Sequence, residues 1–468
     1  MQLPDLKEAR KRTNNKVDYI YENKKVEKVL SGKKYFLKTY GCQMNVHDSE
    51  EIAGRLERLG LTKTDNMEDS DVVILNTCAI RENAHDKMFG FLGRCKHLKE
   101  TKKDLIIGIC GCMAQEASVC EEIIKKHPFV NIVFGTHNIN ELEELLLKND
   151  HKLDINVYSI EGNVYENIPY SRDSKKTAWV NIQYGCDKFC TYCIVPYTRG
   201  KQRSRKSQDI INEVKELVAN GYLEVTLLGQ NVNAYGKDLE DELSFPELLQ
   251  SVSDTGIKRI FFVTSHPWDF TDELIDVIKN NDNIMPYVHL PLQSGNDHIL
   301  KLMGRRYTKE EYLELVKKIK ANIPNVCLTT DIIVGFPGET ESEFADTLEV
   351  VEEVKYDSAF TFIYSPRVGT PAALMKDNVT LKEKEDRLQR LNTIVNKYAL
   401  INNQKYQDKV VEVLVLGESE KDHDKVYGYT NTMKLVNVNA PKDVIGKIIN
   451  VKITDCKSFS LDGVIIDK

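Results

Sequence analysis

The sequence lacks the features of a membrane-bound or exported protein. No apolar run approaches the roughly 20 residues that span a bilayer, and the Lys-rich N-terminal stretch has neither the apolar segment nor the cleavage site of a secretory signal. Excess positive charge is also absent, because 71 acidic residues outnumber 64 basic ones and leave a net charge of −7. Any nucleic-acid footprint must therefore be local. We expect a cytoplasmic protein.

The cysteines do not suit a disulfide framework. Their number is odd, 11 in 468 residues, and no export signal accompanies them. Clustered cysteines in a cytosolic chain point instead to metal binding or redox chemistry. A hydrophobic content of 41% and a charged content of 29% are ordinary for a soluble chain, and the length suggests two to four domains.

The pattern of apolar residues predicts an α/β protein with a smaller all-β part. Strands and helices alternate in the first half and again in the centre, which indicates mainly parallel sheets. The expected segments are a polar leader at 1–33, a parallel α/β sheet domain at 34–150, a linker at 151–174, a partial (βα)6 barrel at 175–404 and a small all-β barrel at 405–468.

The individual strands follow from short apolar runs. In the sheet domain they are expected at 33–40, 71–77, 104–110 and 130–135, with helices at 49–59, 82–99, 115–127 and 139–147. The central domain has six candidates, at 178–184, 224–228, 259–264, 287–292, 326–334 and 358–364. A full eight-stranded barrel would need two more strand–helix units, which the sequence does not offer.

Three closely spaced cysteines follow the first strand of the central domain. Cys186, Cys190 and Cys193 form a C-x3-C-x2-C motif. Iron–sulfur clusters are usually held by four thiolates, so three would leave one iron open for a small molecule. The loop after a strand lies on the face where (βα) barrels build their active sites. A structural zinc knuckle is the alternative, but no His or fourth Cys stands nearby at ligand spacing.

Three isolated cysteines follow strands of the first domain. Cys42, Cys78 and Cys112 can meet because the carboxyl ends of parallel strands share one edge. Cys110 competes with Cys112, from which it is two residues away. Cys95, Cys110, Cys120, Cys327 and Cys456 are expected to be packing residues rather than ligands.

The central domain, from Trp179 to Leu400, resembles the radical SAM superfamily, which carries C-x3-C-x2-C after its first barrel strand. The resemblance implies a [4Fe–4S] cluster on the triplet, with S-adenosylmethionine (SAM) on the open iron and cleavage to a 5′-deoxyadenosyl radical. It also implies SAM contacts at strand ends, from Gln230, Asn231, Gln293, Ser294 and Gly335. The alternative for each is a tight turn in which the residue serves geometry alone.

The stretches "KTYGCQMNVHDSE", "NTCAIRENAHDKMFG" and "GCMAQ" resemble the N-terminal domain of methylthiotransferases, and the last domain resembles a TRAM domain. The subgroup that looks most similar is the MiaB type, the tRNA-2-methylthio-N6-dimethylallyladenosine synthases. This implies a second [4Fe–4S] cluster on Cys42, Cys78 and Cys112 that handles sulfur. It further implies a methylthio group added to C2 of N6-isopentenyladenosine at tRNA position 37. Two SAM per turnover, an external electron donor and a monomeric enzyme are expected with it.

A basic loop follows the triplet and could contact the anticodon loop of tRNA. It holds Arg199, Lys201, Arg203, Arg205 and Lys206, as phosphate neutralisation requires. A merely solvated loop is the alternative. In the TRAM-like segment, Lys434 could contact RNA, and three aromatic residues could either stack on bases or fill the core: Tyr427, Tyr429 and Phe459.

Other functions remain open at this stage. Related methylthiotransferases act on threonylcarbamoyladenosine or on a ribosomal-protein aspartate. A non-catalytic two-cluster electron-transfer protein, or an RNA-binding protein with relic cysteines, would also contain these motifs.

Overall fold

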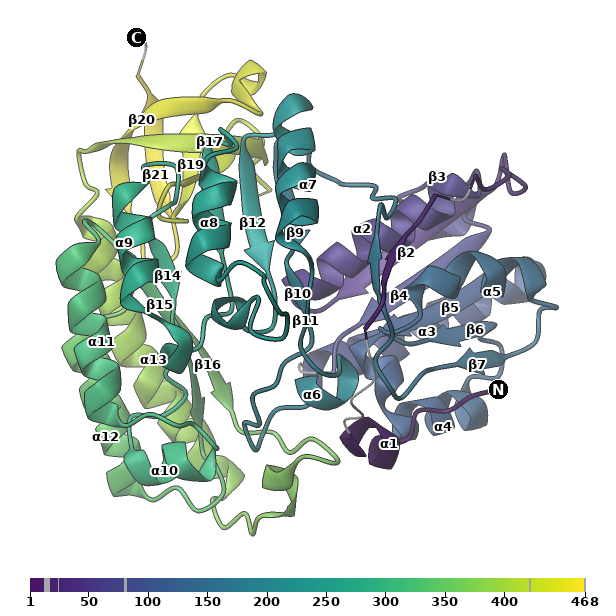
Figure 1. The fold of residues 1–468 in the computed structure, drawn as a ribbon, viewed down its shortest axis with the longest axis horizontal. Coiled ribbons are helices and arrows are strands. Elements are labelled where there is room, and N and C mark those ends of the chain that lie inside the picture. The colour runs from purple at the N-terminus through teal and green to yellow at the C-terminus, as the bar shows by residue number, and fades with distance from the viewer. Residues whose placement is uncertain (12–16, 24, 80–81, 421, 467–468) are drawn as a thin grey trace.

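The computed structural model describes residues 1–11, 17–23, 25–79, 82–420 and 422–466. The chain forms an N-terminal α/β domain, a central half-barrel and a C-terminal β-barrel (Figure 1). The expected α/β architecture with a small all-β end is therefore confirmed. Among the described residues, none of the helices combines the length and apolar character needed to cross a bilayer.

The N-terminal domain is a six-stranded parallel sheet in the order β3-β2-β4-β5-β6-β7. Its strands are β2 (Lys34–Tyr40), β3 (Thr62–Lys63), β4 (Val72–Thr77), β5 (Ile106–Gly111), β6 (Ile132–Phe134) and β7 (Asp154–Asn156). Its helices are α2 (Gln43–Arg58), α3 (Glu82–Thr101), α4 (Ala117–Lys126) and α5 (Leu142–Lys148).

Two features of this domain differ from the sequence expectation. Helix α2 begins at Gln43 rather than near residue 49, so Cys42 occupies its N-cap position. The 151–174 segment, expected as an irregular linker, contributes β7 to the sheet edge and β8 (Val164–Glu166) to a small parallel pair. Both strands are three residues long, too short to show a periodic pattern in sequence.

The described part of the polar leader, residues 1–33, packs against the rest of the chain. It contains α1 (Leu6–Lys11) and β1 (Tyr19–Tyr21), and β1 pairs with β8. The Tyr19 hydroxyl donates to the Ser204 carbonyl at 2.6 Å. These contacts tie the leader to both the linker and the central domain.

The central domain contains the six expected parallel strands, in two three-stranded sheets, β13-β12-β9 and β14-β15-β16. They are β9 (Thr177–Asn181), β12 (Glu224–Leu228), β13 (Arg259–Phe262), β14 (Tyr287–His289), β15 (Cys327–Val334) and β16 (Ser358–Ile363). A hairpin of β10 (Gln183–Tyr184) and β11 (Arg203–Ser204) follows β9. Strand β14 ends earlier than expected because Pro291 lacks the N–H that a ladder requires.

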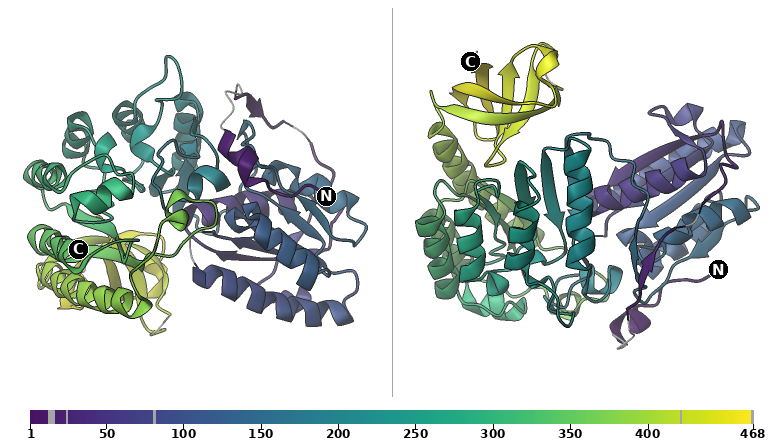
Figure 2. Two further views of the ribbon diagram at one scale, coloured as in Figure 1. Left: turned by 90° about the horizontal axis from the view of Figure 1, so that it is seen from below. Right: turned by 45° about the horizontal axis from the view of Figure 1, so that its top comes forward.

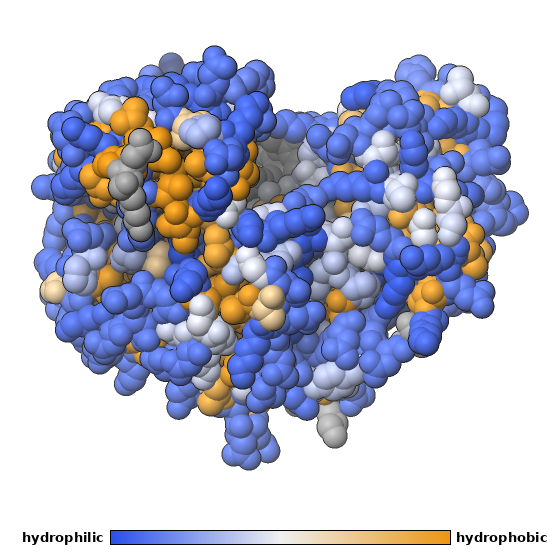
Figure 3. All heavy atoms as spheres, turned by 90° about the horizontal axis from the view of Figure 1, so that it is seen from above, coloured by the Kyte–Doolittle hydropathy of each residue, from blue (hydrophilic) through white to orange (hydrophobic). Residues whose placement is uncertain are grey.

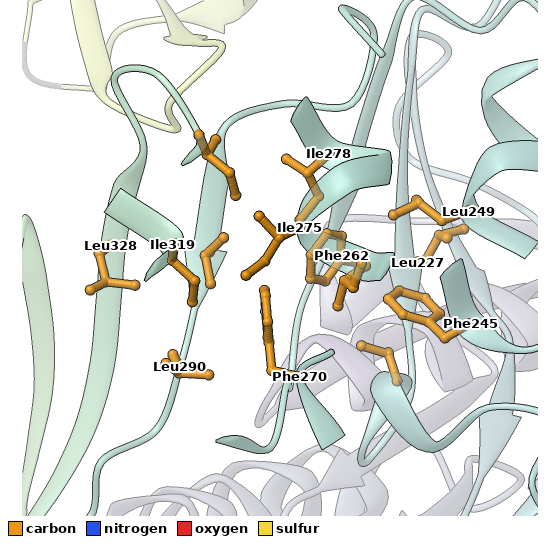
Figure 4. Close-up of a cluster of buried hydrophobic side chains, with 14 of the residues drawn as sticks. Leu227, Phe245, Leu249, Phe262, Phe270, Ile275, Ile278, Leu290, Ile319 and Leu328 are labelled. Carbon is orange, nitrogen blue, oxygen red and sulfur yellow. The ribbon is translucent and has the colours of Figure 1, made fainter. Parts of the chain in front are cut away.

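Helices cover the outside of this half-barrel and close its core (Figure 1). They are α7 (Ser207–Ala219), α8 (Phe245–Ser253), α9 (Asp272–Asn280), α11 (Lys309–Asn322), α12 (Glu341–Val354) and α13 (Leu381–Gln404). Two short helices lie elsewhere: α6 (Val195–Thr198) at the interface with the N-terminal domain and α10 (Asp297–Leu302) at the carboxyl ends of the strands (Figure 1). Figure 4 shows Phe245 and Phe262 in edge contact, with Ile275 and Leu290 nearby. Burying each such side chain contributes about 1.5–3 kcal/mol, so this core fixes where the strand ends lie.

The C-terminal domain is a closed five-stranded barrel in the order β17-β18-β19-β21-β20. Its strands are β17 (Val410–Glu418), β18 (Val426–Thr430), β19 (Leu435–Asn439), β20 (Ile448–Cys456) and β21 (Leu461–Ile465). It joins the half-barrel at the N-terminal ends of the strands, where buried Arg259 donates to the Tyr429 carbonyl at 3.0 Å. Lys434 is buried there and pairs with Asp357 at 2.9 Å. The expectation that it contacts RNA is therefore wrong, because its ammonium belongs to the domain junction.

The barrel domains and the N-terminal domain form two lobes (Figure 2). Seen from the side of the C-terminal barrel, the surface is hollowed between these lobes (Figure 3). The carboxyl ends of the half-barrel strands, with α10, lie at the opposite end from β17–β21 (Figures 1 and 2).

Candidate metal centres

The structure brings Cys42, Cys78 and Cys112 together at one sheet edge. They follow β2, β4 and β5, which are neighbours in the sheet. Cys42 and Cys78 share a hydrogen bond, and Cys42 is close enough to Cys112 for its charge to help raise the pKa of the Cys112 thiol. Gly111 allows the turn into Cys112, since it has φ +94° and a Cβ there would lie 2.3 Å from the Thr77 carbonyl oxygen.

The surroundings of Cys42 favour its thiolate form. The hydrogen bond with Cys78 lowers the pKa of the Cys42 thiol to about 5, opposed by burial and assisted by the positive charge of Arg199. Backbone groups of Met44 and Asn45, in the first turn of α2, act in the same direction. The thiolate is the form that binds metal, so this residue is prepared as a ligand.

Arg199 reaches from the central domain into this cysteine site. Its Nε donates to Cys112 Sγ at 3.2 Å, and its Nη2 pairs with Asp48 at 2.5 Å. The side chain is 6% exposed. Since α6 connects Cys193 to Arg199, a short segment links the two cysteine sites. Arg199 was expected to contact RNA, but a buried guanidinium held by two protein partners does not present itself to a phosphate.

Cys186, Cys190 and Cys193 form the second site. Each thiol lies close enough to feel the charge of another. Burial raises the pKa of the Cys186 thiol to about 11 and that of Cys193 further. The Lys188 amide donates to Cys186 Sγ at 3.4 Å, and Arg305 Nη1 to Cys190 Sγ at 3.4 Å. A bound metal deprotonates such thiols outright, so their high pKa values do not oppose ligation.

The two cysteine sites adjoin each other across the domain interface. Ile194, the residue after Cys193, packs against Cys112 and against Ala79, the residue after Cys78. In the described part of the chain, no three His, Cys, Asp or Glu side chains are arranged to hold a single metal ion.

Polar side chains without partners collect at the carboxyl ends of the half-barrel strands. Within the described residues, buried side-chain nitrogen or oxygen atoms lack a hydrogen-bond partner in both Gln230 and Gln293. The same holds for further residues at these strand ends that the sequence analysis missed: Asn181, Gln183, Asn233, Ser265 and Tyr364. We call these strand-end residues the SAM ledge. Because buried polar groups are normally paired, their unpaired atoms fit a polar ligand such as SAM.

The other residues expected to contact SAM each make a hydrogen bond within the protein. Asn231 Nδ2 donates to Asp269 at 2.8 Å, while its Oδ1 lacks a partner among the described residues. Ser294 is buried and accepts from the Asn296 amide at 3.3 Å. The Gly335 amide donates to Glu339 at 2.7 Å with φ +70°. Ser294 and Gly335 therefore also serve turn geometry, the alternative raised from sequence.

Two more residues of the basic loop are buried in protein contacts. Arg205 holds Glu166 through Nη2 at 2.6 Å and Glu213 through Nη1 at 2.8 Å. Arg203 Nη1 donates to the Gly162 carbonyl at 2.6 Å. The expectation of RNA contact is wrong for these guanidinium groups in this structure, because neither faces solvent. Lys201 is half-buried and stays a candidate.

We expect Arg205→Met to affect stability rather than RNA affinity. Removing the guanidinium leaves the Glu166 carboxylate buried without its partner, which costs about 3–5 kcal/mol. Urea unfolding measures this loss. The slope of log affinity for tRNA against log salt should not change, whereas a lost phosphate contact would reduce it by about one. Lys201→Ala serves as the comparison, and a reduced slope for Arg205→Met alone would contradict the assignment.

We also expect His47 to make the N-terminal domain sensitive to acid. His47 is buried against Tyr170, and burial lowers its pKa to about 3. Below about pH 6.5 the unfolded chain binds a proton that the folded chain does not, so stability falls by about 1.4 kcal/mol per pH unit. Between pH 7.5 and pH 5.5 the free energy of unfolding, measured with urea, should fall by about 1.4 kcal/mol less in His47→Gln than in the wild type. Equal drops in both proteins would contradict this.

Three family profiles match the chain. The radical SAM superfamily matches residues 180–351, the uncharacterized protein family UPF0004 matches 34–135, and the TRAM domain matches 404–466. The starts of these matches fall close to the starts of the three structural domains, at β2, β9 and the end of α13.

Curated relatives cover nearly the whole chain. A tRNA-2-methylthio-N(6)-dimethylallyladenosine synthase of Bacillus licheniformis is 55% identical over 98% of this chain and 92% of its own length. One of Bacillus subtilis (strain 168) is 54% identical over the same shares. Among solved structures, the radical S-adenosylmethionine methyltransferase TsrM from Kitasatospora setae, with cobalamin and a [4Fe-4S] cluster bound, covers 73% of this chain and 77% of its own. Its TM-score of 0.53 at 13% identity shows a shared fold alone.

Proposed function

The chain belongs to the family of tRNA-2-methylthio-N(6)-dimethylallyladenosine synthases, and on that premise we propose which of its residues perform the reaction. It is a radical SAM transferase that adds a methylthio group to C2 of N6-isopentenyladenosine at tRNA position 37. The subgroups acting on threonylcarbamoyladenosine or on a protein aspartate are thereby disfavoured. The observation that carries the residue assignment is the meeting of two cysteine triads across one domain interface.

Cys186, Cys190 and Cys193 would hold the radical SAM [4Fe–4S] cluster, and Cys42, Cys78 and Cys112 a second one. When bound, the first group supplies the electron that cleaves SAM, and the second presents sulfur. The chain's own part is to bind and orient. Gln230 and Gln293 offer unpaired polar atoms to SAM. The apolar packing of Ala79 and Ile194 against Cys112 keeps water from the space between the sites.

The ion pairs of Asp269 support the same assignment, because they join the triplet loop to the proposed SAM-binding residues. Asp269 accepts from Lys188 and Lys237, each at 2.8 Å, and also from Asn231. These contacts fix Asn231 beside Gln230 at the end of β12. Lys188 lies within the triplet loop, so the loop and the SAM ledge are held together by one buried carboxylate.

The tRNA would enter from the side of the C-terminal barrel, where the surface is hollowed between the lobes (Figure 3). Phe459 on this barrel is 74% exposed, and Tyr427 and Tyr429 are partly exposed. Exposed aromatic faces stack on the bases of single-stranded loops. Phe360 and Phe362 on β16 are also exposed and could receive the isopentenyl adenine. We further propose that the enzyme works as a cytoplasmic monomer, since one chain supplies both triads.

Nucleoside mass spectrometry tests this function. Anaerobically reconstituted enzyme with SAM, dithionite and tRNA carrying N6-isopentenyladenosine should form the 2-methylthio derivative and 5′-deoxyadenosine. The same tRNA without the isopentenyl group is the matched control. Deleting the gene should remove the methylthio group and keep the isopentenyl group. An unchanged nucleoside profile would refute the substrate assignment.

A further inference from the structure

The leader, residues 1–33, has no task in the proposed reaction. Two described pieces of it lie along the boundary between the N-terminal domain and the half-barrel (Figures 1 and 2): residues 1–11, which contain α1, and residues 17–23, which contain β1. We call these two pieces the strap. In Figure 1, α1 lies beside α6, at the end of the molecule opposite the C-terminal barrel.

The first piece of the strap is anchored on the N-terminal domain. The Gln2 amide donates to the Ile155 carbonyl at 2.6 Å, and the Gln2 carbonyl accepts from the Val157 amide at 3.0 Å. The Asp5 amide donates to Ser159 Oγ at 2.7 Å. These bonds attach the strap to the sheet edge at β7 and fix the place where α1 begins.

Helix α1 then reaches the half-barrel side of the boundary. It packs against α6, the short helix that follows the cysteine triplet. Leu6 packs closely on Gly369, where a Cβ would lie 2.1 Å from Leu6 Cδ2. In the same loop after β16, the Ala372 amide donates to the carbonyl of Thr191 in the triplet loop at 2.9 Å. A helix rooted on one domain is therefore packed against segments that adjoin the triad of the other.

The second piece of the strap joins the two domains again. The Tyr21 hydroxyl donates to Asp209 on α7 at 2.8 Å. The next residue, Glu22, pairs with Arg55 at 2.5 Å and with Arg58 at 3.0 Å, both on α2. Arg55 is fully buried, and a buried charge that loses a partner is costly. Since α2 begins directly after the first cysteine of the N-terminal triad, the strap also holds the helix of that site.

The radical triad has anchors of its own inside the half-barrel domain. The Thr191 amide donates to the Met303 carbonyl at 2.9 Å, and Thr191 Oγ1 donates to the Leu302 carbonyl at 2.8 Å. The contacts of the strap, by contrast, join this domain to the N-terminal one. Loss of the strap should therefore change the placement of the two triads relative to each other, and leave the shape of each triad intact.

An arm that contacts RNA is the alternative role for the leader. Residues 1–11 hold three basic and two acidic side chains, so their charges nearly cancel. Phosphate binding needs a local excess of positive charge. The hollow between the lobes opens on the side of the C-terminal barrel (Figure 3), whereas α1 lies at the opposite end (Figure 1). Both observations favour a role between the domains.

We propose that the strap is a positioning element of the sulfur-transfer step, with Leu6 and Glu22 as its positioning residues. The inference rests on the proposed function, in which the radical forms at one triad and the sulfur comes from the other. SAM cleavage needs only the radical triad and the SAM ledge. Transfer needs both triads in register, and a misplacement of about 1 Å costs on the order of 100-fold in rate.

Leu6→Asp tests the α1 anchor in the full-length, reconstituted enzyme. A carboxylate is costly in the apolar contact with Gly369, so α1 should leave its place. Formation of 5′-deoxyadenosine should stay within about twofold, whereas the methylthio product should fall by about tenfold. Leu3→Asp is the matched control, because Leu3 is 41% exposed in the same piece of the strap. Leu6→Met keeps the apolar volume and should retain the wild-type product ratio.

Glu22→Gln tests the second anchor independently. The substitution keeps the shape of the side chain and removes the charge that faces Arg55 and Arg58. The ratio of 5′-deoxyadenosine to methylthio product should rise, as in Leu6→Asp. Glu27→Gln is the matched control, because Glu27 is exposed and belongs to the same leader. Its ratio should equal that of the wild type.

Two further readouts do not depend on turnover. In the protein without clusters, hydrogen exchange of the Thr198 and Arg199 amides, which bond within the α6 turn, should become about tenfold faster in Leu6→Asp. With both clusters bound and reduced, the magnetic coupling between them, measured by electron paramagnetic resonance, should change in Leu6→Asp and not in Leu3→Asp. This coupling depends steeply on distance, and a fold that is merely less stable would not alter it.

An unchanged ratio of the two products in both Leu6→Asp and Glu22→Gln would overturn the proposal. Equal losses of 5′-deoxyadenosine and methylthio product would also overturn it, because they indicate a general loss of folded enzyme. Weaker tRNA binding with a smaller salt slope would make the leader an RNA-contacting arm instead. If the wild-type enzyme forms no methylthio product, the proposed function itself fails.

Discussion

Replacing Cys186, Cys190 and Cys193 together by alanine should abolish both 5′-deoxyadenosine formation and methylthio transfer. The three thiols lie together next to the ledge of unpaired polar side chains. Without these thiols, the cluster whose fourth iron would bind SAM has no protein ligands. Iron content should fall from about eight to about four per chain, because each cubane cluster contributes four. Anaerobic iron analysis and detection of 5′-deoxyadenosine measure both effects.

The matched control removes three cysteines that lie elsewhere. Cys95 and Cys120 are buried in the helices α3 and α4 of the N-terminal core, and Cys456 lies in β20. Changing these three to alanine should leave iron content and both activities intact, at a cost of about 1 kcal/mol for each buried residue. Full iron content in the first triple variant, or loss of iron in the control, would contradict the ligand assignment.

Replacing Cys42, Cys78 and Cys112 by alanine should uncouple the two halves of the reaction. The ligands of the radical site are intact in this variant, so SAM cleavage should continue. Methylthio transfer should fall below detection, because the sulfur-handling site is gone. The expected signature is 5′-deoxyadenosine without 2-methylthio product, with about four iron atoms per chain. Product formation at the wild-type level would refute the role of this triad.

Cys110 gives the sharpest control for the second triad. It is two residues from Cys112, yet it lies within β5 and is buried in a hydrophobic cluster with Ile74 and Phe134, whereas Cys112 follows the end of the strand. Burial raises the pKa of its thiol well above the usual value. We expect Cys110→Ala to keep both clusters and the activity, and to lower stability by about 1 kcal/mol. Loss of the second cluster in this variant would exchange the roles of Cys110 and Cys112.

Arg199 shows why the two triads should be studied together. It follows the radical triad in sequence but donates to Cys112 of the other triad. Hydrogen bonds to cluster sulfurs and nearby positive charge help set reduction potentials. Any substitution at Arg199 therefore acts on the N-terminal site and on the domain interface, and a loss of activity there is no sign of RNA contact.

The sequence by itself determined the domain order, the six strands of the half-barrel and the closely spaced motif of Cys186, Cys190 and Cys193. These are local properties, because strand–helix alternation and a C-x3-C-x2-C spacing are readable within a few residues. The position of Cys42, Cys78 and Cys112 after three strands already implied one sheet edge. Short strands such as β7 and the early start of α2 were missed, since tertiary pairing overrides weak local patterns.

Only the tertiary structure decided what the polar and charged side chains do. Arg199 and its partner Asp48 are 151 residues apart in the chain, and Lys434 and Asp357 are 77 apart. Whether an arginine faces RNA or a buried carboxylate depends on such distant partners, which no local pattern contains. The same holds for the unpaired ledge at the strand ends. It arises where loops from separate strands meet, because the packed core fixes those strand ends in space.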